Sequence, residues 1–306
     1  MSPAAPSIFS ARQKIVGIVF ALVAAISFSA KAVMVKLAYV DAVDAITLLA
    51  LRMAFSLPFF LIVAAMENRN KRNAALTAKD KFAVVGLGLV GYYLASYLDF
   101  MGLQYISAGL ERLILFLYPT MVVLISALIF KQRIGRTILF ALLVSYAGIA
   151  LVYIHDMHVL QHDALTGSVL VFGSAWAYAV YLVGAGHTIA KVGATRFTAY
   201  VLTVACVACL VQFAVTHTVA DLHLPARVYG LGIAMALLST VLPTFLLAAA
   251  MRRIGSTHTS MIGSIGPVST LFLAYVFLGE QLSLVQISGS ILVLVGVLMI
   301  SLKKQV

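Results

Sequence analysis

Five ionisable side chains lie within apolar stretches of the first half of the chain: Lys31, Arg52, Asp99, Glu111 and Arg112. A charged group inside a bilayer costs about 2.5–3.5 kcal/mol on insertion scales, so such residues need a partner, water or a function. Lys31 lies about 12 Å from the nearer end of its stretch at 1.5 Å per residue. We expect its ammonium to face water, an acid or a substrate anion, with snorkelling to the lipid interface as the alternative.

The two acids have two alternative uses. Asp99 and Glu111 can carry a coupling proton if burial favours their neutral forms, or they can neutralise Arg52 and Arg112. Arg52 has a structural alternative as well, in which it holds helices together through backbone carbonyls or through Asp99. The cluster therefore predicts either a binding and coupling site or a set of structural ion pairs.

Aromatic and hydroxyl side chains dominate the second half, whose apolar stretches contain no Lys, Arg, Asp or Glu in their interiors. A cavity between the halves would have one aromatic, hydroxyl-rich wall and one charged wall, which suits a small carboxylate with an apolar body. Aromatic stripes also arise from ordinary packing. The predicted substrate-binding residues are Lys31, Tyr93, Tyr97, Arg112, Trp176, Tyr181 and Ser260. The predicted coupling or gating residues are Arg52, Asp99, Glu111, Pro119, His258 and Pro267. No cofactor or metal is predicted.

The elements that position these residues are membrane spans. A chain with 63% hydrophobic and only 10% charged residues is typical of an integral membrane protein. Runs of roughly 17–25 apolar residues predict ten helices. They are Ile15–Tyr39, Thr47–Met66, Phe82–Met101, Gly109–Phe130, Thr137–Ile154, Leu165–Gly186, Phe197–Val215, Tyr229–Met251, Thr257–Leu278 and Leu284–Leu302.

The net charge of +11 would suit a nucleic-acid partner in a soluble protein, but here the cations follow the spans. With the N-terminus in the cytoplasm, Arg227 is the one cation in an outside loop, and this bias predicts that both termini are cytoplasmic. Lys31, Lys36, Arg52 and Arg112 fall within spans. The predicted inside cations are Arg12, Lys14, Arg69, Lys71, Arg72, Lys79, Lys81, Lys131, Arg133, Arg136, Lys191, Arg196, Arg252, Arg253, Lys303 and Lys304.

An internal repeat divides the chain. An offset of 148 residues lays Pro119 on Pro267 and Gly148 on Gly296. Because each half has an odd number of spans, the second copy must enter the membrane upside down, which predicts two inverted five-helix repeats at residues 1–154 and 155–306. The paired prolines are either hinges or packing kinks, since each removes a helical hydrogen bond.

Two further patterns have structural interpretations. Gly86, Gly88 and Gly91 match G-x-G-x-x-G, but no strand precedes them, so we interpret them as contacts between helices. Cys206 and Cys209 lie inside the seventh span and are expected to be buried as small apolar residues.

Short motifs occur in both halves of the chain. They are Gly102-Leu103-Gln104-Tyr105-Ile106-Ser107-Ala108, then Pro119, and later Gly279-Glu280-Gln281-Leu282 with Gly289 and Gly296. In these residues the chain resembles the EamA-like branch of the drug/metabolite transporter superfamily. The resemblance implies ten helices in two inverted repeats with cytoplasmic termini, and a cavity lined mainly by the first, third, fourth, sixth, eighth and ninth helices. The chain departs from the pattern at Glu111-Arg112, where many members are apolar.

The prediction is a secondary transporter of the cytoplasmic membrane that exports a small metabolite, such as an amino acid or related carboxylate, by alternating access. The alternatives are a membrane channel and a membrane-embedded enzyme acting on a lipid-like substrate. The expected partners are a small-molecule substrate and the lipid bilayer, with no nucleic acid. Gly148 and Gly296 permit the fifth and tenth helices to pack either against the bundle or in a homodimer.

Overall fold

The computed structural model describes residues 11–69, 76–129, 131, 135–160, 163–281 and 283–302, and the regular structure in these ranges is entirely helical. Phe130, Lys71, Arg72, Arg133, Leu282, Lys303 and Lys304, which the sequence analysis used, lie outside these ranges. The helices of the first half are α1 (Ala11–Tyr39), α2 (Ala45–Arg69), α3 (Ala78–Gly88), α4 (Ala95–Leu103), α5 (Ala108–Leu115), α6 (Tyr118–Ile129) and α7 (Arg136–Leu160). Those of the second half are α8 (Ala164–Val192), α9 (Ala194–Thr216), α10 (Ala226–Ala236), α11 (Leu242–Gly263), α12 (Gly266–Leu278) and α13 (Leu284–Leu302).

Eight helical stretches of the described chain are long and apolar enough to cross a membrane, and they match the first eight predicted spans. Two shorter apolar helices, 266–278 and 284–299, fall where the ninth and tenth spans are predicted. The chain is thus a multi-pass membrane protein.

The ninth span is not one continuous helix, in contrast to the prediction. Gly255 has backbone angles (φ 79°, ψ 162°) that glycine alone adopts readily, and it separates the eighth span from a short helical stretch that ends at Gly263. A turn at Ser264 and Ile265 follows, and α12 then begins with Pro267 in its first turn. Proline fits there because the first helical N–H groups lack intrahelical partners anyway.

The fourth span has a matching interruption. It turns at Phe116 and Leu117, between α5 and α6, and Pro119 again lies in the first turn of the helix that follows. Pro119 and Pro267 therefore start half-helices within their spans rather than kink continuous ones.

The third and eighth spans each contain a π-helical segment, η1 (Leu89–Leu94) and η4 (Leu237–Val241). Such segments insert an extra residue into a helix and redirect its side chains. Element starts recur at the offset of 148 residues that pairs the prolines. The pairs are Ala78 with Ala226 (α3 and α10), Leu89 with Leu237 (η1 and η4) and Arg136 with Leu284 (α7 and α13).

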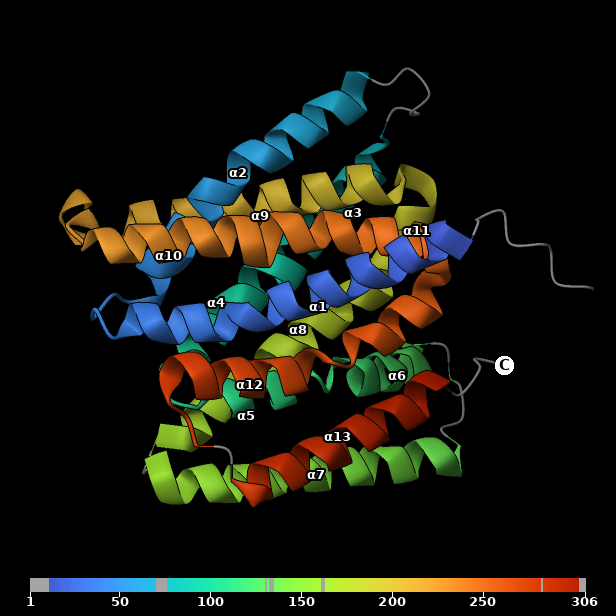
Figure 1. Ribbon diagram of the computed structural model, residues 1–306. Coiled ribbons are helices and arrows are strands. Elements are labelled where there is room, and N and C mark those ends of the chain that lie inside the picture. The colour runs from blue at the N-terminus through green and yellow to red at the C-terminus, as the bar shows by residue number, and fades with distance from the viewer. Residues whose placement is uncertain are drawn as a thin grey trace, which may run out of the picture.

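The helices lie roughly side by side, with α1 in the middle against α11 and α12 (Figure 1). α7 and α13 form one edge of the molecule and run in opposite directions. α1 begins and α13 ends on the same side of the bundle, at the right of Figure 1. The core around α1, α2, α4 and α9 is apolar, with Leu48, Met53 and Phe100 fully buried.

Glycines permit the closest helix contacts. A Cβ on Gly148 would lie 2.6 Å from the carbonyl oxygen of Gly289, and one on Gly296 would lie 2.6 Å from that of Ala141. The small residues of α7 and α13 are therefore covered within the chain. Gly88 and Gly91 also form tight helix contacts, as predicted, whereas Gly86 faces open space. Cys206 and Cys209 are buried, as expected, and form no disulfide.

Candidate functional site

Lys31 lies at the meeting point of three helices. Its Nζ on α1 donates hydrogen bonds to Asp99 Oδ2 on α4 and, at 3.0 Å, to Glu111 Oε1 on α5. The side-chain exposures of Lys31 and Glu111 are 13% and 0%, and that of Asp99 is 4%. The structure thus brings together three of the five charged residues singled out by sequence, in what we call the Lys31 cluster (Lys31, Asp99 and Glu111).

Two carboxylate oxygens of the Lys31 cluster lack a partner. Asp99 Oδ1 and Glu111 Oε2 are both buried, and neither accepts a hydrogen bond from the described residues. One ammonium therefore serves two carboxylates in a space with almost no exposure to solvent. A buried charge without a full set of partners is costly, so this arrangement is unusual for a purely structural ion pair.

Arg112 follows Glu111 directly but points elsewhere. Its guanidinium lies against the backbone at Gly266, where a Cβ would be 2.6 Å from Nη2. Arg112 thus links the last turn of α5, before the first break, to the first turn of α12, after the second break. Its Nε is buried, and its side chain has no hydrogen bond or ion pair among the described residues.

Two tyrosine side chains lie within electrostatic range of this guanidinium. Arg112 is near enough to Tyr118 on α6 and Tyr178 on α8 for its charge to act on both side chains. The two tyrosine rings meet edge to face, with centroids 5.3 Å apart. Arg112, Tyr118 and Tyr178 form what we call the Arg112 site: one cation and two hydroxyl groups beside two helix breaks. This donor set is suited to a carboxylate.

Arg52 is separate from both groups. Its Nε donates to Thr240 Oγ1 at 3.0 Å, and its guanidinium lies 5.2 Å from the centroid of the Phe100 ring. Arg52 is buried and joins α2, α4 and η4. These contacts correspond to the structural alternative, with a threonine hydroxyl in place of the expected backbone carbonyls.

Side-chain hydroxyls attach α1 to the second half of the chain. Ser29 Oγ donates to the Gly266 carbonyl at 2.9 Å, and Ser239 Oγ of η4 donates to the Ser27 carbonyl at 2.9 Å. These two bonds to the second half are neutral, whereas Lys31 joins α1 to the first half through ion pairs.

Tyr181, one of the predicted substrate contacts, lies in an aromatic cluster. Its ring stacks on Tyr178 and Phe197 and meets Tyr92 edge to face at 5.1 Å between centroids. Only 5% of Tyr181 is exposed. The cluster packs around Tyr178, which lies within electrostatic range of Arg112.

The other predicted contacts lie apart from Arg112. Trp176 is half-buried and packs near Phe172, with ring centroids 6.5 Å apart. Tyr93 and Tyr97 pack on the core around α1, α2 and α9. His258 and Ser260 belong to the stretch between Gly255 and Gly263, and His258 is exposed. The structure thus does not gather the predicted substrate-binding residues in one place.

Two residues near these groups, Tyr118 and Glu280, were not predicted from the sequence. Tyr118 precedes Pro119, and its place beside a helix break was the available signal. Glu280 Oε1 accepts a hydrogen bond from the Ala108 N–H at 3.1 Å, at the start of α5. A carboxylate at this helix end is favoured by the helix dipole and joins the two halves of the chain.

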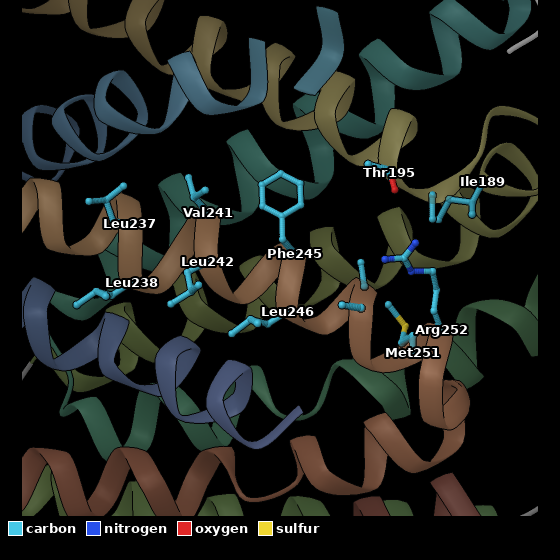
Figure 2. A pocket seen from close by; sticks show the side chains of 13 residues that line it. Ile189, Thr195, Leu237, Leu238, Val241, Leu242, Phe245, Leu246, Met251 and Arg252 are labelled. Atoms are coloured by element: carbon cyan, nitrogen blue, oxygen red, sulfur yellow. The ribbon is translucent and has the colours of Figure 1, made fainter. Parts of the chain in front are cut away.

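A separate pocket of about 940 Å³ follows η4 and the first half of α11. Ile189, Thr195 and Arg252 lie at one end, and Leu237 and Leu238 of η4 lie at the other (Figure 2). None of the predicted site residues lines it. The pocket is apolar apart from Thr195 and Arg252, and its η4 end adjoins Ser239, which is bonded to α1 one turn before Lys31.

Comparison with known proteins gives consistent matches. A model of the EamA-like transporter family matches residues 15–154 and 165–302. The uncharacterized transporter YcbK of Bacillus subtilis (strain 168) is 29% identical over 287 residues, covering 91% of this chain and 90% of its own. The uncharacterized transporter YyaM of the same organism is 25% identical over 72% of this chain and 73% of its own. One solved crystal structure shares the fold with a TM-score of 0.65 at 16% identity, over 92% of this chain and 95% of its own.

Proposed function

The chain belongs to the EamA-like transporter family, and from this premise we propose that it is a secondary transporter exporting a small carboxylate, such as an amino acid or related metabolite. The observation that carries the substrate class is Arg112. A guanidinium that has no hydrogen bond or ion pair among the described residues, within electrostatic range of two tyrosine side chains inside an apolar bundle, is a binding group for an anion. Ligand sites in transporters of this type lie where broken helices meet near the middle of the membrane.

Lys31 has a different place in this proposal. Two carboxylates already neutralise its ammonium, so Lys31 attracts a further anion less strongly than a guanidinium that has no acid partner. The role of anion partner, for which the sequence offered Lys31 or Arg112, therefore falls to Arg112.

Alternating access is supported by the repeated architecture. The two π-helical segments, the two helix breaks and the start of the fifth helix in each half recur at one offset, and α7 and α13 run in opposite directions (Figure 1). These features favour two inverted five-helix repeats. In this scheme the half-helices that start at Pro119 and Pro267 change their angles as the site opens to either side.

The pocket along η4 and α11 supports access from one side of the membrane. Arg252 lies at one end of the pocket, on the side where α1 begins, and the apolar lining extends to η4, which is bonded to α1. Arg12, Lys14, Lys79 and Lys81 occur near helix ends on that same side. We assign this side to the cytoplasm on the positive-inside rule, which places both termini there in the cytoplasmic membrane.

Counterflow in proteoliposomes tests the proposal. Vesicles are loaded with a pooled set of labelled amino acids, organic acids, their amides and cationic drugs, and the retained species are read by mass spectrometry. We expect exchange of a carboxylate-bearing solute against the same unlabelled solute outside. Single-channel currents in a planar bilayer would identify a channel, and a chemically altered solute without vectorial movement would identify an enzyme. Either result would overturn the proposal.

A further inference from the structure

The Lys31 cluster has one more acid than base within contact distance. The ammonium bonds to one oxygen of each carboxylate, while Asp99 Oδ1 and Glu111 Oε2 are buried without partners. A proton on either acid would remove the excess negative charge and give one orphaned oxygen a hydrogen to donate. Lys31 would remain paired with the other carboxylate, and the only bond formed is the carboxyl O–H.

Other charged groups around the Lys31 cluster affect how readily its two carboxylates take up a proton. Arg52 on α2 acts on Asp99 from a distance, and Arg112 on α5 acts on Glu111. Tyr39 at the end of α1 donates to the Phe100 carbonyl next to Asp99. α12 contributes no Asp, Glu, Lys, Arg or His between Gly266 and Leu278. The two guanidinium groups favour ionised carboxylates, whereas burial favours neutral ones.

Arg112 is the cation of this environment that has neither a hydrogen bond nor an ion pair among the described residues. Arg52 Nε donates to Thr240 Oγ1, although the buried Nη1 of Arg52 also lacks a partner. A carboxylate bound at Arg112 would neutralise the cation that stabilises ionised Glu111. By thermodynamic linkage, each ligand would then strengthen the binding of the other.

We propose that the Lys31 cluster binds one exchangeable proton, and that Arg112 couples this proton to carboxylate binding so that the two bind together. The coupling rests on the proposed function, whereas the proton site does not. Joint binding means that one proton crosses the membrane with each carboxylate-bearing solute, as a neutral pair for a monoanion and with one positive charge for a zwitterionic amino acid. The geometry therefore assigns proton–carboxylate cotransport, in the direction set by the two gradients, rather than exchange of one for the other.

Infrared difference spectroscopy on protein in lipid nanodiscs tests the proton site without any solute. We expect wild-type protein to show a carboxylic acid C=O band that appears on acidification. Asp99→Asn and Glu111→Gln should each shift or abolish this band. Asp221→Asn, which removes an exposed carboxylate bonded to Thr218 between α9 and α10, should leave it unchanged. Wild-type protein with no titrating band, or a band indifferent to both cluster variants, would overturn the proton site even if one variant fails to fold.

The coupling is tested with a second pair of variants. Arg112→Gln imitates the neutralised cation and should raise the titration midpoint of the cluster by about one pH unit or more, a tenfold gain in proton affinity. Arg227→Gln removes a cation that pairs with Asp41, at 3.7 Å between Nη1 and Oδ2, and that is not part of the cluster. This variant should leave the midpoint unchanged. A midpoint that stays or falls in Arg112→Gln overturns the coupling. Because no solute is used, these results are independent of the counterflow outcome.

Discussion

Lys31 and Arg112 are both cations inside an apolar bundle, yet their surroundings differ. Lys31 is held by two buried acids, while Arg112 has no partner among the described residues. The presence of an acid near Lys31 could be predicted, since a buried ammonium needs one. The identity of the unpartnered cation could not be predicted, because it depends on the direction of the last turn of α5, just before the break in the fourth span.

This contrast predicts that replacing Lys31 costs much more stability than replacing Arg112. Lys31→Met leaves two buried carboxylates without their cation and should cost about 3–5 kcal/mol at neutral pH, whereas Arg112→Gln loses no partner and should cost much less. The loss in Lys31→Met should shrink as the pH falls, because a protonated carboxyl is cheaper to bury. Thermal unfolding in detergent measures both variants.

A double variant provides the control. Lys31→Met with Glu111→Gln removes one of the stranded charges and should recover part of the stability lost in Lys31→Met. If Lys31→Met unfolded at the wild-type temperature, the ion pairs of the Lys31 cluster would not contribute to the stability of the fold as described.

Arg52 and Tyr181 illustrate the limit of sequence reasoning for individual residues. Thr240, the partner of Arg52, lies in η4, and a π-helical segment leaves no mark in hydrophobic periodicity. Tyr181 was expected as a stacking surface for substrate, but its ring faces Tyr92 from the π-helical η1. Both contacts depend on local helix distortions that direct side chains.

At the level of elements, the first eight spans were predictable from apolar runs of sufficient length. The breaks were not, since Phe116 and Leu117 are as apolar as their neighbours and only Pro119 marks the position. The ninth span was likewise predicted as continuous, because hydrophobicity does not report whether a helix turns. These breaks place Arg112 against Gly266 and so create the Arg112 site.

Close packing of α7 on α13 leads to a prediction about glycine. Gly289→Ala should destabilise the protein by about 1–3 kcal/mol, because its Cβ would lie 2.7 Å from the Gly148 carbonyl oxygen. Gly86→Ala should be neutral or stabilising, because Gly86 has open space around it and alanine favours helix. Melting temperatures in detergent compare the two variants. Equal melting temperatures would mean that α7 and α13 do not pack as closely as described.

At the scale of the whole molecule, the repeat was readable from the sequence because an offset of 148 residues pairs prolines and glycines. The structure extends this offset to element boundaries. Which side of the bundle faces the cytoplasm depends on the distribution of cations and is open to direct measurement.

Thiol labelling tests that orientation. In a background with Cys206 and Cys209 replaced by alanine, Val219→Cys should react with a membrane-impermeant maleimide on intact cells, since Val219 is 78% exposed between α9 and α10. Lys79→Cys, exposed at the start of α3 on the opposite side, should react only after permeabilisation. The reverse pattern would invert the assigned topology.

The central claim is that Arg112 recognises the carboxylate of the transported solute. Its most direct test is counterflow of a retained acid and of its uncharged amide by wild-type, Arg112→Gln and Arg227→Gln proteins. We predict that the wild type moves the acid but not the amide, that Arg112→Gln loses most acid transport while remaining folded, and that Arg227→Gln behaves as wild type. Undiminished acid transport by Arg112→Gln would contradict the claim.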